Sequence, residues 1–124
     1  MVYGLGVDLV DVARIGRMLG RLSPYGLSLL FAPAERRRAA AGDAPYAAGR
    51  FAAKEALLKA LGIGLSRGAR RLSEIETYEG AHGAPAVRAS GVVGAELAAR
   101  GVTRVHVSIT HERGYAAAVV VLEG

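Results

Sequence analysis

Apolar and polar residues alternate at both ends of the chain. Over residues 2–10 the apolar side consists of Tyr3, Leu5, Val7 and Leu9, and the other side of Gly4, Gly6 and Asp8. This period of two predicts a half-buried strand in which Asp8 points away from the apolar face. Residues 105–110 alternate in the same way. After a turn at 112–114, the apolar run 115–122 predicts the second strand of a hairpin.

Helical patterns fill the stretches between these strands. Asp11 is placed to cap a helix from about residue 12 to residue 20. Residues 46–61 are strong helix formers and are followed by glycines. A shorter helix is predicted over residues 90–100, where Gly101 provides the stop.

The middle of the chain is less regular. Pro33 is expected to open a helical turn that carries Glu35. Strands are predicted at 74–79 and 85–88, on either side of a glycine-rich turn. Together these elements indicate an α+β fold in which an antiparallel sheet packs with helices. No change of composition marks a boundary, so residues 1–124 are expected to form one domain.

Composition limits how much such a domain can bury. Apolar residues make up 52% of the chain, but many are alanine, and 17 glycines add to the conformational entropy lost on folding. A core this thin would gain from oligomerisation, which covers apolar surface that one chain leaves exposed. The chain has no cysteine, no signal-peptide pattern and no apolar run of about 20 residues. We therefore expect a cytoplasmic protein that does not enter a membrane.

The net charge of +5 indicates an anionic partner. All but two of the 16 basic residues are arginine, which binds phosphate and carboxylate groups in a bidentate way. Nucleic acid is disfavoured, because only 6% of residues are aromatic and none is tryptophan, which leaves few platforms for stacking bases. In the first predicted helix Arg14, Arg17 and Arg21 share a face with Met18. This face is either merely solvated or a docking surface for an acidic partner helix.

The charged residues of the central helix allow two interpretations. In the simpler one, Glu55 and Lys59 form an ordinary ion pair one helical turn apart on an exposed strip. In the other, Glu55 meets Asp8, and the two carboxylates hold a magnesium ion whose other ligands are water and substrate phosphate. Spacing in the sequence does not decide whether the two acids meet. Asp8 could equally be a turn former ahead of the first helix.

Two further patterns stay open. His106, Ser108 and Thr110 share one strand face, which invites comparison with a serine hydrolase. No G-x-S-x-G turn is present, however, and a solvated face is the simpler account. Gly62 and Gly64 could cradle a phosphate with their N–H groups, or they could simply end the central helix.

Three segments together resemble the holo-acyl-carrier-protein synthase family of 4′-phosphopantetheinyl transferases. They are residues 4–10 (GLGVDLV) with the following Arg14-Ile15, residues 49–56 (GRFAAKEA) continuing through Lys59 to Gly62, and residues 105–111 (VHVSITH) before Tyr115. Their order and spacing match from end to end, and the middle segment is highly specific. The resemblance implies the fold of that family. It also implies transfer of the 4′-phosphopantetheine group of coenzyme A to a serine of an apo acyl carrier protein.

The resemblance further implies roles for single residues. Asp8 and Glu55 would hold magnesium and would be catalytic together with Lys59. The coenzyme A cleft would be lined by Arg50, Lys59, Gly62, Gly64, His106 and Thr110. The acidic recognition helix of the carrier protein would dock on Arg14, Met18 and Arg21. Glu35 matches an acid that would orient a water on the metal. Independently of the resemblance, the position of His111 in the predicted turn favours a structural role.

The family is typically a homotrimer with sites between subunits, which suits the thin core. The implied reaction is attack of the serine hydroxyl on the β-phosphate, with adenosine 3′,5′-bisphosphate leaving. Either Glu55 or a water on the metal would take the proton. One departure is Ala84 in the turn Gly83-Ala84-Pro85, where family members commonly have lysine.

Two alternative hypotheses about function do not depend on the resemblance to this family. One is a non-enzymatic basic module that binds an acidic protein or RNA through its arginines. The other is a different magnesium-dependent phosphoryl-transfer enzyme. The sequence leaves open whether the carrier protein serves fatty acid or polyketide synthesis.

Overall fold

The computed structural model of the chain describes residues 1–63 and 69–124. The strands are β1 Val2–Asp11, β2 Ile75–Glu79, β3 Pro85–Ala89, β4 Arg104–Glu112 and β5 Tyr115–Glu123. The α-helices are α1 Val12–Leu19, α2 Pro24–Leu30, α3 Pro33–Ala40, α4 Ala44–Ala60 and α6 Gly91–Ala99. Two short 3-10 helices, η1 Ala69–Glu74 and η2 Ala81–Gly83, complete these elements. The predicted α+β fold is therefore confirmed.

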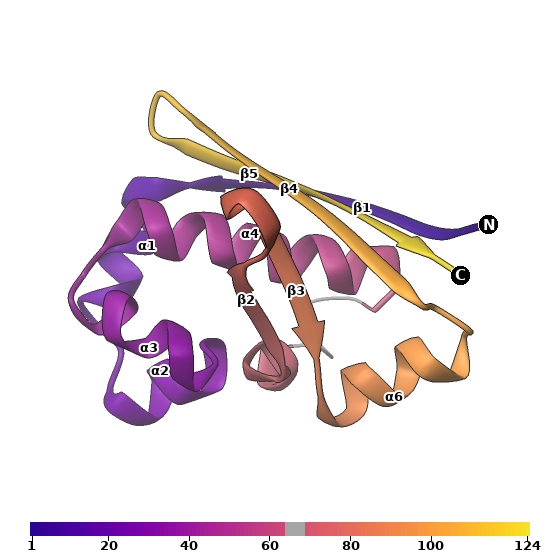
Figure 1. Cartoon of the computed structure of the whole chain (residues 1–124). Coiled ribbons are helices and arrows are strands. Elements are labelled where there is room, and N and C mark those ends of the chain that lie inside the picture. Colours follow the sequence, from indigo (N-terminus) through magenta and orange to yellow (C-terminus); the bar gives the residue numbers. More distant parts are fainter. Residues whose placement is uncertain (64–68) are drawn as a thin grey trace.

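A three-stranded antiparallel sheet crosses one side of the long helix α4 (Figure 1). Its strand order is β1-β5-β4, so the N-terminal strand pairs with the second strand of the predicted C-terminal hairpin. The strands β2 and β3 form a separate two-stranded sheet beside α4, with α1 to α3 at one end of the molecule and α6 at the other. Across the described ranges, no helix is long and apolar enough to cross a membrane.

Strand β1 turns its glycine side toward the helix. Gly6 and Val10 are buried, whereas Leu5, Val7 and Leu9 are 67%, 60% and 66% exposed. The half-buried strand was predicted correctly, but the apolar side that we expected to be covered faces outward in the single chain. The interface between the sheet and α4 therefore consists of the glycines of β1 and of every second side chain of β4 and β5, which faces inward.

Close contact between two backbones explains this orientation. A Cβ atom on Gly6 would lie 1.8 Å from the carbonyl oxygen of Ala56, and one on Gly4 would lie 2.2 Å from that of Ala60. No side chain fits at either place, because real Cβ atoms do not approach other atoms so closely. The glycines thus let β1 lie directly against the C-terminal half of α4.

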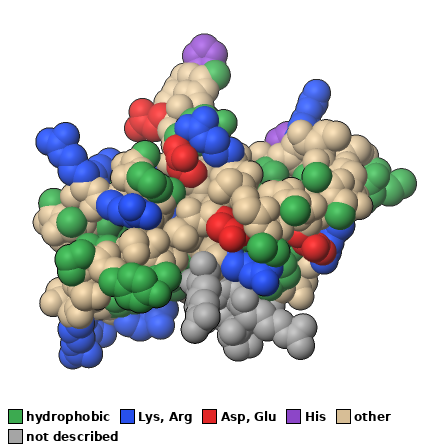
Figure 2. Space-filling view, turned by 90° about the horizontal axis from the view of Figure 1, so that it is seen from below, with side chains coloured by type: hydrophobic (Ala, Val, Ile, Leu, Met, Phe, Trp, Pro, Cys, Tyr) green, Lys and Arg blue, Asp and Glu red, His purple; other side chains and the backbone are tan. Residues whose placement is uncertain are grey.

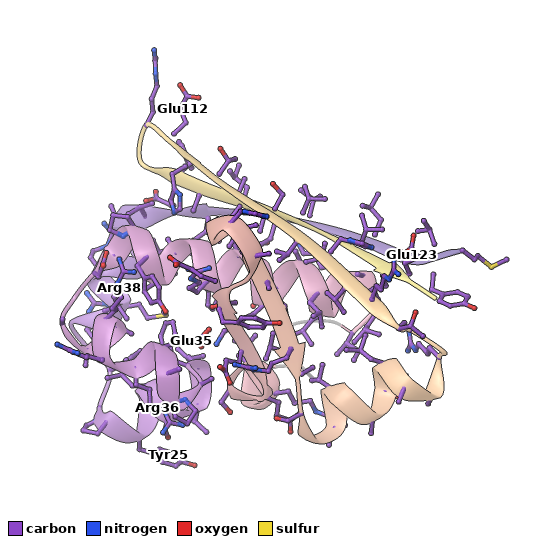
Figure 3. All side chains as sticks on the ribbon, in the orientation of Figure 1. Tyr25, Glu35, Arg36, Arg38, Glu112 and Glu123 are labelled. Atoms are coloured by element: carbon purple, nitrogen blue, oxygen red, sulfur yellow. The ribbon has the colours of Figure 1, made fainter. Side chains whose placement is uncertain are left out.

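A buried ion pair joins α3, α4 and β2. Glu35 and Lys54 are both fully buried, and Lys54 Nζ donates hydrogen bonds to Glu35 Oε1 and, at 2.8 Å, to the carbonyl oxygen of Leu30. Glu35 also accepts hydrogen bonds from the N–H of Ala32 at 2.8 Å and from the N–H and hydroxyl of Thr77 at 2.9 and 2.5 Å. Figure 3 shows Glu35 pointing from α3 into the interior, beside β2 and β3. Both carboxylate oxygens are therefore satisfied by protein groups.

This cluster corrects the role that the resemblance implied for Glu35. Its carboxylate is enclosed by protein donors, so it does not face a metal-bound water. Burial lowers the pKa of Lys54, and the neighbouring negative charge of Glu35 opposes that shift. Burying two charges costs several kcal/mol, which a complete set of hydrogen bonds offsets. The pair is a structural clamp that holds α4 to its neighbours.

The ends of the helices follow ordinary capping chemistry. The side chain of Asp11 accepts a hydrogen bond from the N–H of Arg14 at 3.2 Å, as predicted for the cap of α1. Helix α2 was not predicted, although Ser23 caps it and Pro24 occupies its first turn. It has only seven residues and buries none of them, so it leaves no apolar period in the sequence.

Replacing Lys54 by methionine should destabilise the protein by about 3–5 kcal/mol, because the change leaves a buried carboxylate without its cation. The free energy of unfolding from urea titration, at one fixed protein concentration, measures this loss. Arg88→Met is the matched control, since it removes one partner of the exposed pair in which Arg88 Nη2 and Glu76 Oε1 are 2.8 Å apart. A loss no larger than that of the control would contradict the structural role of the clamp.

Candidate functional site

Asp8 lies on the side of β1 that faces α4. Its register partner in β5 is Ala118, and its side chain is 14% exposed. Lys59 reaches it from α4, with Nζ 3.0 Å from Asp8 Oδ1 and 3.1 Å from the carbonyl oxygen of Val7. The structure thus brings Asp8 and Lys59 together as an ion pair between β1 and α4.

Glu55 lies one helical turn before Lys59 and is 6% exposed. Its Oε1 atom is buried and has no hydrogen-bond partner among the residues that the structure describes. Loss of hydration raises the pKa of Glu55 to about 6, and the negative charge of Asp8 adds to the rise, while Lys59 and Arg14 oppose it. The two carboxylates are therefore near enough to repel each other. Within the described part of the chain, Lys59 pairs with Asp8 and not with Glu55, so the simple pair within the helix is not formed.

The donor set at this point fits a magnesium ion. Asp8 and Glu55 offer carboxylate oxygens, and one of those oxygens, Glu55 Oε1, is buried without a donor from the described residues. Magnesium in proteins is commonly bound by one or two carboxylates together with water and substrate phosphate. In residues 1–63 and 69–124 no group of three or more His, Cys, Asp and Glu side chains converges. Further ligands would therefore have to come from water or substrate.

A cleft of about 370 Å³ lies between the start of α4 and the β2–β3 hairpin. Arg38 lines it and donates two hydrogen bonds to Asp43 Oδ2, at 3.0 and 2.7 Å, which hold the pKa of Asp43 below its usual value. The guanidinium carbons of Arg38 and Arg50 lie 4.0 and 4.9 Å from the centre of the Tyr46 ring. Two cations around one aromatic ring suit a ligand that carries both a ring and negative charge.

The cleft and the carboxylates open on different sides of α4. Asp8 belongs to β1 at one edge of the three-stranded sheet, whereas Ile109 and His111 of the cleft belong to β4 at the other edge. Arg50 and Glu55 are five residues apart on α4, which separates them by about 140° around the helix axis. One chain therefore does not bring Arg50 together with Asp8 and Glu55.

Gly62 ends α4 with a φ of 72°. Its N–H donates to the carbonyl oxygen of Lys59 at 2.9 Å, and the N–H of Ile63 donates to that of Leu58 at 2.8 Å. This is the helix-ending alternative for the glycine. A contact between Gly62 and phosphate stays a prediction, and Gly64 lies outside the described residues.

His106 and Thr110 lie on the outer face of the sheet. Their register partners in β5 are Val121 and Ala117, and both side chains are exposed, with His106 Nε2 3.4 Å from Glu123 Oε1. Asp8 is on the opposite face of the same sheet. A single chain therefore brings His106 and Thr110 neither to the carboxylates nor to the cleft.

Of the predicted docking residues, Arg14 and Met18 lie on helix α1, and Arg21 follows its C-terminal end in a turn. Arg14, Arg17 and Arg21 are exposed, and Met18 is half-buried against the core. Figure 2 shows basic side chains around the edge of the half of the molecule formed by α1 to α3, with hydrophobic side chains between them. This arrangement agrees with a surface for an acidic partner, although the methionine contributes to the core as well.

His111, Tyr46 and Arg38 are cleft residues that the sequence did not identify. We expected His111 to be structural, and its Nε2–H does donate to the carbonyl oxygen of Pro45 at 2.9 Å, but the side chain also lines the cleft. The spacing of Tyr46 and Arg50, four residues apart on a helix, was a usable signal for a shared surface. Arg38 offered none, because it belongs to a different helix.

Comparison with known proteins gives one family. The profile described as 4′-phosphopantetheinyl transferase superfamily matches residues 4–120. A holo-[acyl-carrier-protein] synthase of Clavibacter michiganensis is 48% identical over 124 residues, covering 100% of this chain and 98% of that protein. A holo-[acyl-carrier-protein] synthase of Syntrophus aciditrophicus is 43% identical over 126 residues, covering 100% of this chain and 98% of that protein.

Solved structures agree with the sequence relatives. The holo-[acyl-carrier-protein] synthase of Neisseria meningitidis has a TM-score of 0.86 and 34% identity, and the match covers 100% of both chains. That of Helicobacter pylori, in complex with coenzyme A, has a TM-score of 0.78 and 30% identity over 96% of this chain and 99% of that one. The similarity thus extends over essentially the whole fold.

Replacing Glu55 by glutamine should stabilise the protein by about 1 kcal/mol at pH 7.5 in the presence of a chelator. The glutamine removes a buried negative charge that lies near Asp8 and whose Oε1 receives no hydrogen bond from the residues placed in the structure. Urea titration measures the change, and Glu112→Gln at the exposed tip of the β4–β5 hairpin (Figure 3) is the control. A marked loss of stability in Glu55→Gln would show that the carboxylate is needed for folding and is not held in reserve for a ligand.

Proposed function

Because the chain belongs to the 4′-phosphopantetheinyl transferase superfamily, we propose that it transfers the 4′-phosphopantetheine group of coenzyme A to a serine of an apo acyl carrier protein. The observation that carries the proposal is the buried carboxylate of Glu55, whose Oε1 has no hydrogen-bond partner in residues 1–63 and 69–124, beside the Asp8–Lys59 pair. Two acids and a lysine at one point form a site for a cation and a diphosphate. We take residues 1–124 to be one domain that carries this activity.

The transfer exchanges one phosphorus–oxygen bond for another. The serine oxygen of the carrier protein forms a bond to the β-phosphorus of coenzyme A. The bond from that phosphorus to the bridging oxygen breaks, and adenosine 3′,5′-bisphosphate leaves with the electron pair. The serine proton passes to Glu55 or to a water molecule at the site.

The residues divide the work by their charge. Asp8 and Glu55 would hold a magnesium ion, which when bound neutralises negative charge that develops on the diphosphate. The ammonium group of Lys59 is half-exposed and can reach phosphate oxygens at the same point. Arg50 and Arg38, which both lie against the Tyr46 ring, would hold the nucleotide part of coenzyme A in the cleft.

The carrier protein is proposed to dock on α1. Arg14 on α1 and Arg21 just after it are exposed, and Arg14 is close enough to the site for its charge to lower the pKa of Glu55. Met18 would add apolar contact at the same face. The product would serve fatty acid or polyketide synthesis, and the cysteine-free composition suits a cytoplasmic enzyme.

We further propose that the active unit is a homotrimer with its sites between subunits. The outer face of the sheet offers Leu5, Val7 and Leu9 for burial, together with Tyr115 and Val119 of β5. A coenzyme A molecule could contact both the cleft and the carboxylates only by lying between two chains, since they open on different sides of α4. Head-to-tail contacts of this kind close into a ring when the rotation between subunits allows it.

The first test is transfer itself. Incubation with coenzyme A, magnesium and an apo carrier protein should add about 340 Da to the carrier, read by intact-mass spectrometry. Asp8→Asn should lower the rate at least about 100-fold, because it removes charge at the diphosphate, and a chelator should abolish transfer. Glu112→Gln should match the wild type. Unmodified carrier after prolonged incubation with wild-type protein would reject the proposed function.

A second test addresses the position of the sites. Asp8→Asn and Arg50→Ala subunits are each nearly inactive alone, but after equal mixing through dissociation and reassembly they should regain about a quarter of wild-type activity. Random mixing gives that share of sites an intact Asp8 from one subunit and an intact Arg50 from the next. Mixtures that stay at the level of the separate variants would place each site within one chain.

A further inference from the structure

Lys59 stands where it can compete with a cation for Asp8. Its ammonium group donates hydrogen bonds to Asp8 Oδ1 at 3.0 Å and to the carbonyl oxygen of Val7 at 3.1 Å. It does not bond to Glu55 Oε1, which has no donor in the described part of the chain, although Glu55 is only one helical turn away. The ammonium group of Lys59 therefore forms its ion pair with Asp8 and not with Glu55.

We propose that Lys59 is an internal counter-ion that must leave Asp8 before a divalent cation can be held by Asp8 and Glu55. The inference rests on the proposed function of these carboxylates. An ammonium group and a divalent cation repel each other strongly at a shared oxygen, because Coulomb energy varies inversely with distance. Cation binding and release of Lys59 are therefore coupled.

The structure makes this release easy. The side chain of Lys59 is 53% exposed, and a four-carbon stem lets its charged end swing away without moving α4. Exposed ion pairs contribute little to stability, so a stronger cation displaces the lysine readily. Once released, the ammonium group is free to bind substrate phosphate, which gives one residue two successive partners.

Arg14 offers a natural contrast. Its charge lowers the pKa of Glu55, as the charge of Lys59 does, so it is also close to the carboxylates. Among the described residues, only the lysine of these two forms an ion pair with Asp8. Removing Arg14 thus tests the general effect of one positive charge, and removing Lys59 tests direct competition.

The experiment measures binding of Mn²⁺ to the wild type, Lys59→Met and Arg14→Met, without coenzyme A or carrier protein. Free Mn²⁺ is followed by its electron paramagnetic resonance signal. Lys59→Met should bind Mn²⁺ about two- to fivefold more tightly than the wild type, the size expected when a competing ion pair is removed. Arg14→Met should change the affinity less. Thermal unfolding provides a second readout, in which Mn²⁺ raises the midpoint of Lys59→Met more than that of the wild type.

The outcomes separate this inference from the function on which it rests. Equal or weaker binding by Lys59→Met, with clear binding by the wild type, overturns the competition and leaves the metal site standing. An equal gain in Arg14→Met also overturns it, because the effect is then general electrostatics. Absence of binding in all three proteins at millimolar Mn²⁺ removes the metal site itself. Circular dichroism checks the fold of each variant, and Lys59→Gln replaces Lys59→Met if the latter is misfolded.

Discussion

The ammonium group of Lys54 against the carboxylate of Glu35 is the contact on which the rest of the molecule depends. It binds α4 to α3 and, through Thr77, to β2, with every oxygen of the carboxylate occupied. Successive residues of a helix point about 100° apart, so a helix fixed at Lys54 has a fixed direction for Glu55. Lys54 of the buried pair and Glu55 of the candidate site are therefore neighbours in the chain with separate roles.

A second constraint, which fixes the position of Asp8, comes from strand β1. Gly4 and Gly6 admit the backbone of α4 so closely that no side chain fits between them, and this places Asp8 against the last turns of the helix. Helix and strand thus set the two carboxylates independently, one by a side-chain clamp and one by contact between backbones. The raised pKa of Glu55 reflects the cost of this arrangement, which a bound cation would offset.

The sequence was sufficient for the strands, most helices and the grouping of Asp8, Glu55 and Lys59 by motif. Among residues far apart in the chain, it was insufficient for contacts that no motif marks. The Glu35–Lys54 contact spans 19 residues, and nothing in the local pattern of either residue reveals it. The outward turn of Leu5, Val7 and Leu9 was missed for a different reason, because periodicity identifies two faces of a strand without saying which one meets the helix.

The candidate site likewise combines features that the local sequence predicts with features that depend on the rest of the fold. The helix-ending role of Gly62 and the exposed arginines of α1 follow from local rules. The separation of Arg50 and Glu55 around α4 also follows from their spacing, but which elements of the fold each of them meets does not. His106 and Thr110 match a motif, yet lie on the outer face of the sheet, so their function depends on what that face meets.

Strand β1 is also an edge of its sheet, and that has a consequence for the newly made protein. Its outer face is rich in large apolar side chains. In the described part of the chain, its outer edge pairs with no strand, so its backbone groups can bond to a strand of another molecule. Such a surface invites misassociation until it is covered. In the trimer proposed above, yield on overexpression and recovery from dilute storage would therefore depend on how quickly subunits associate, more than on the intrinsic stability of the individual chain.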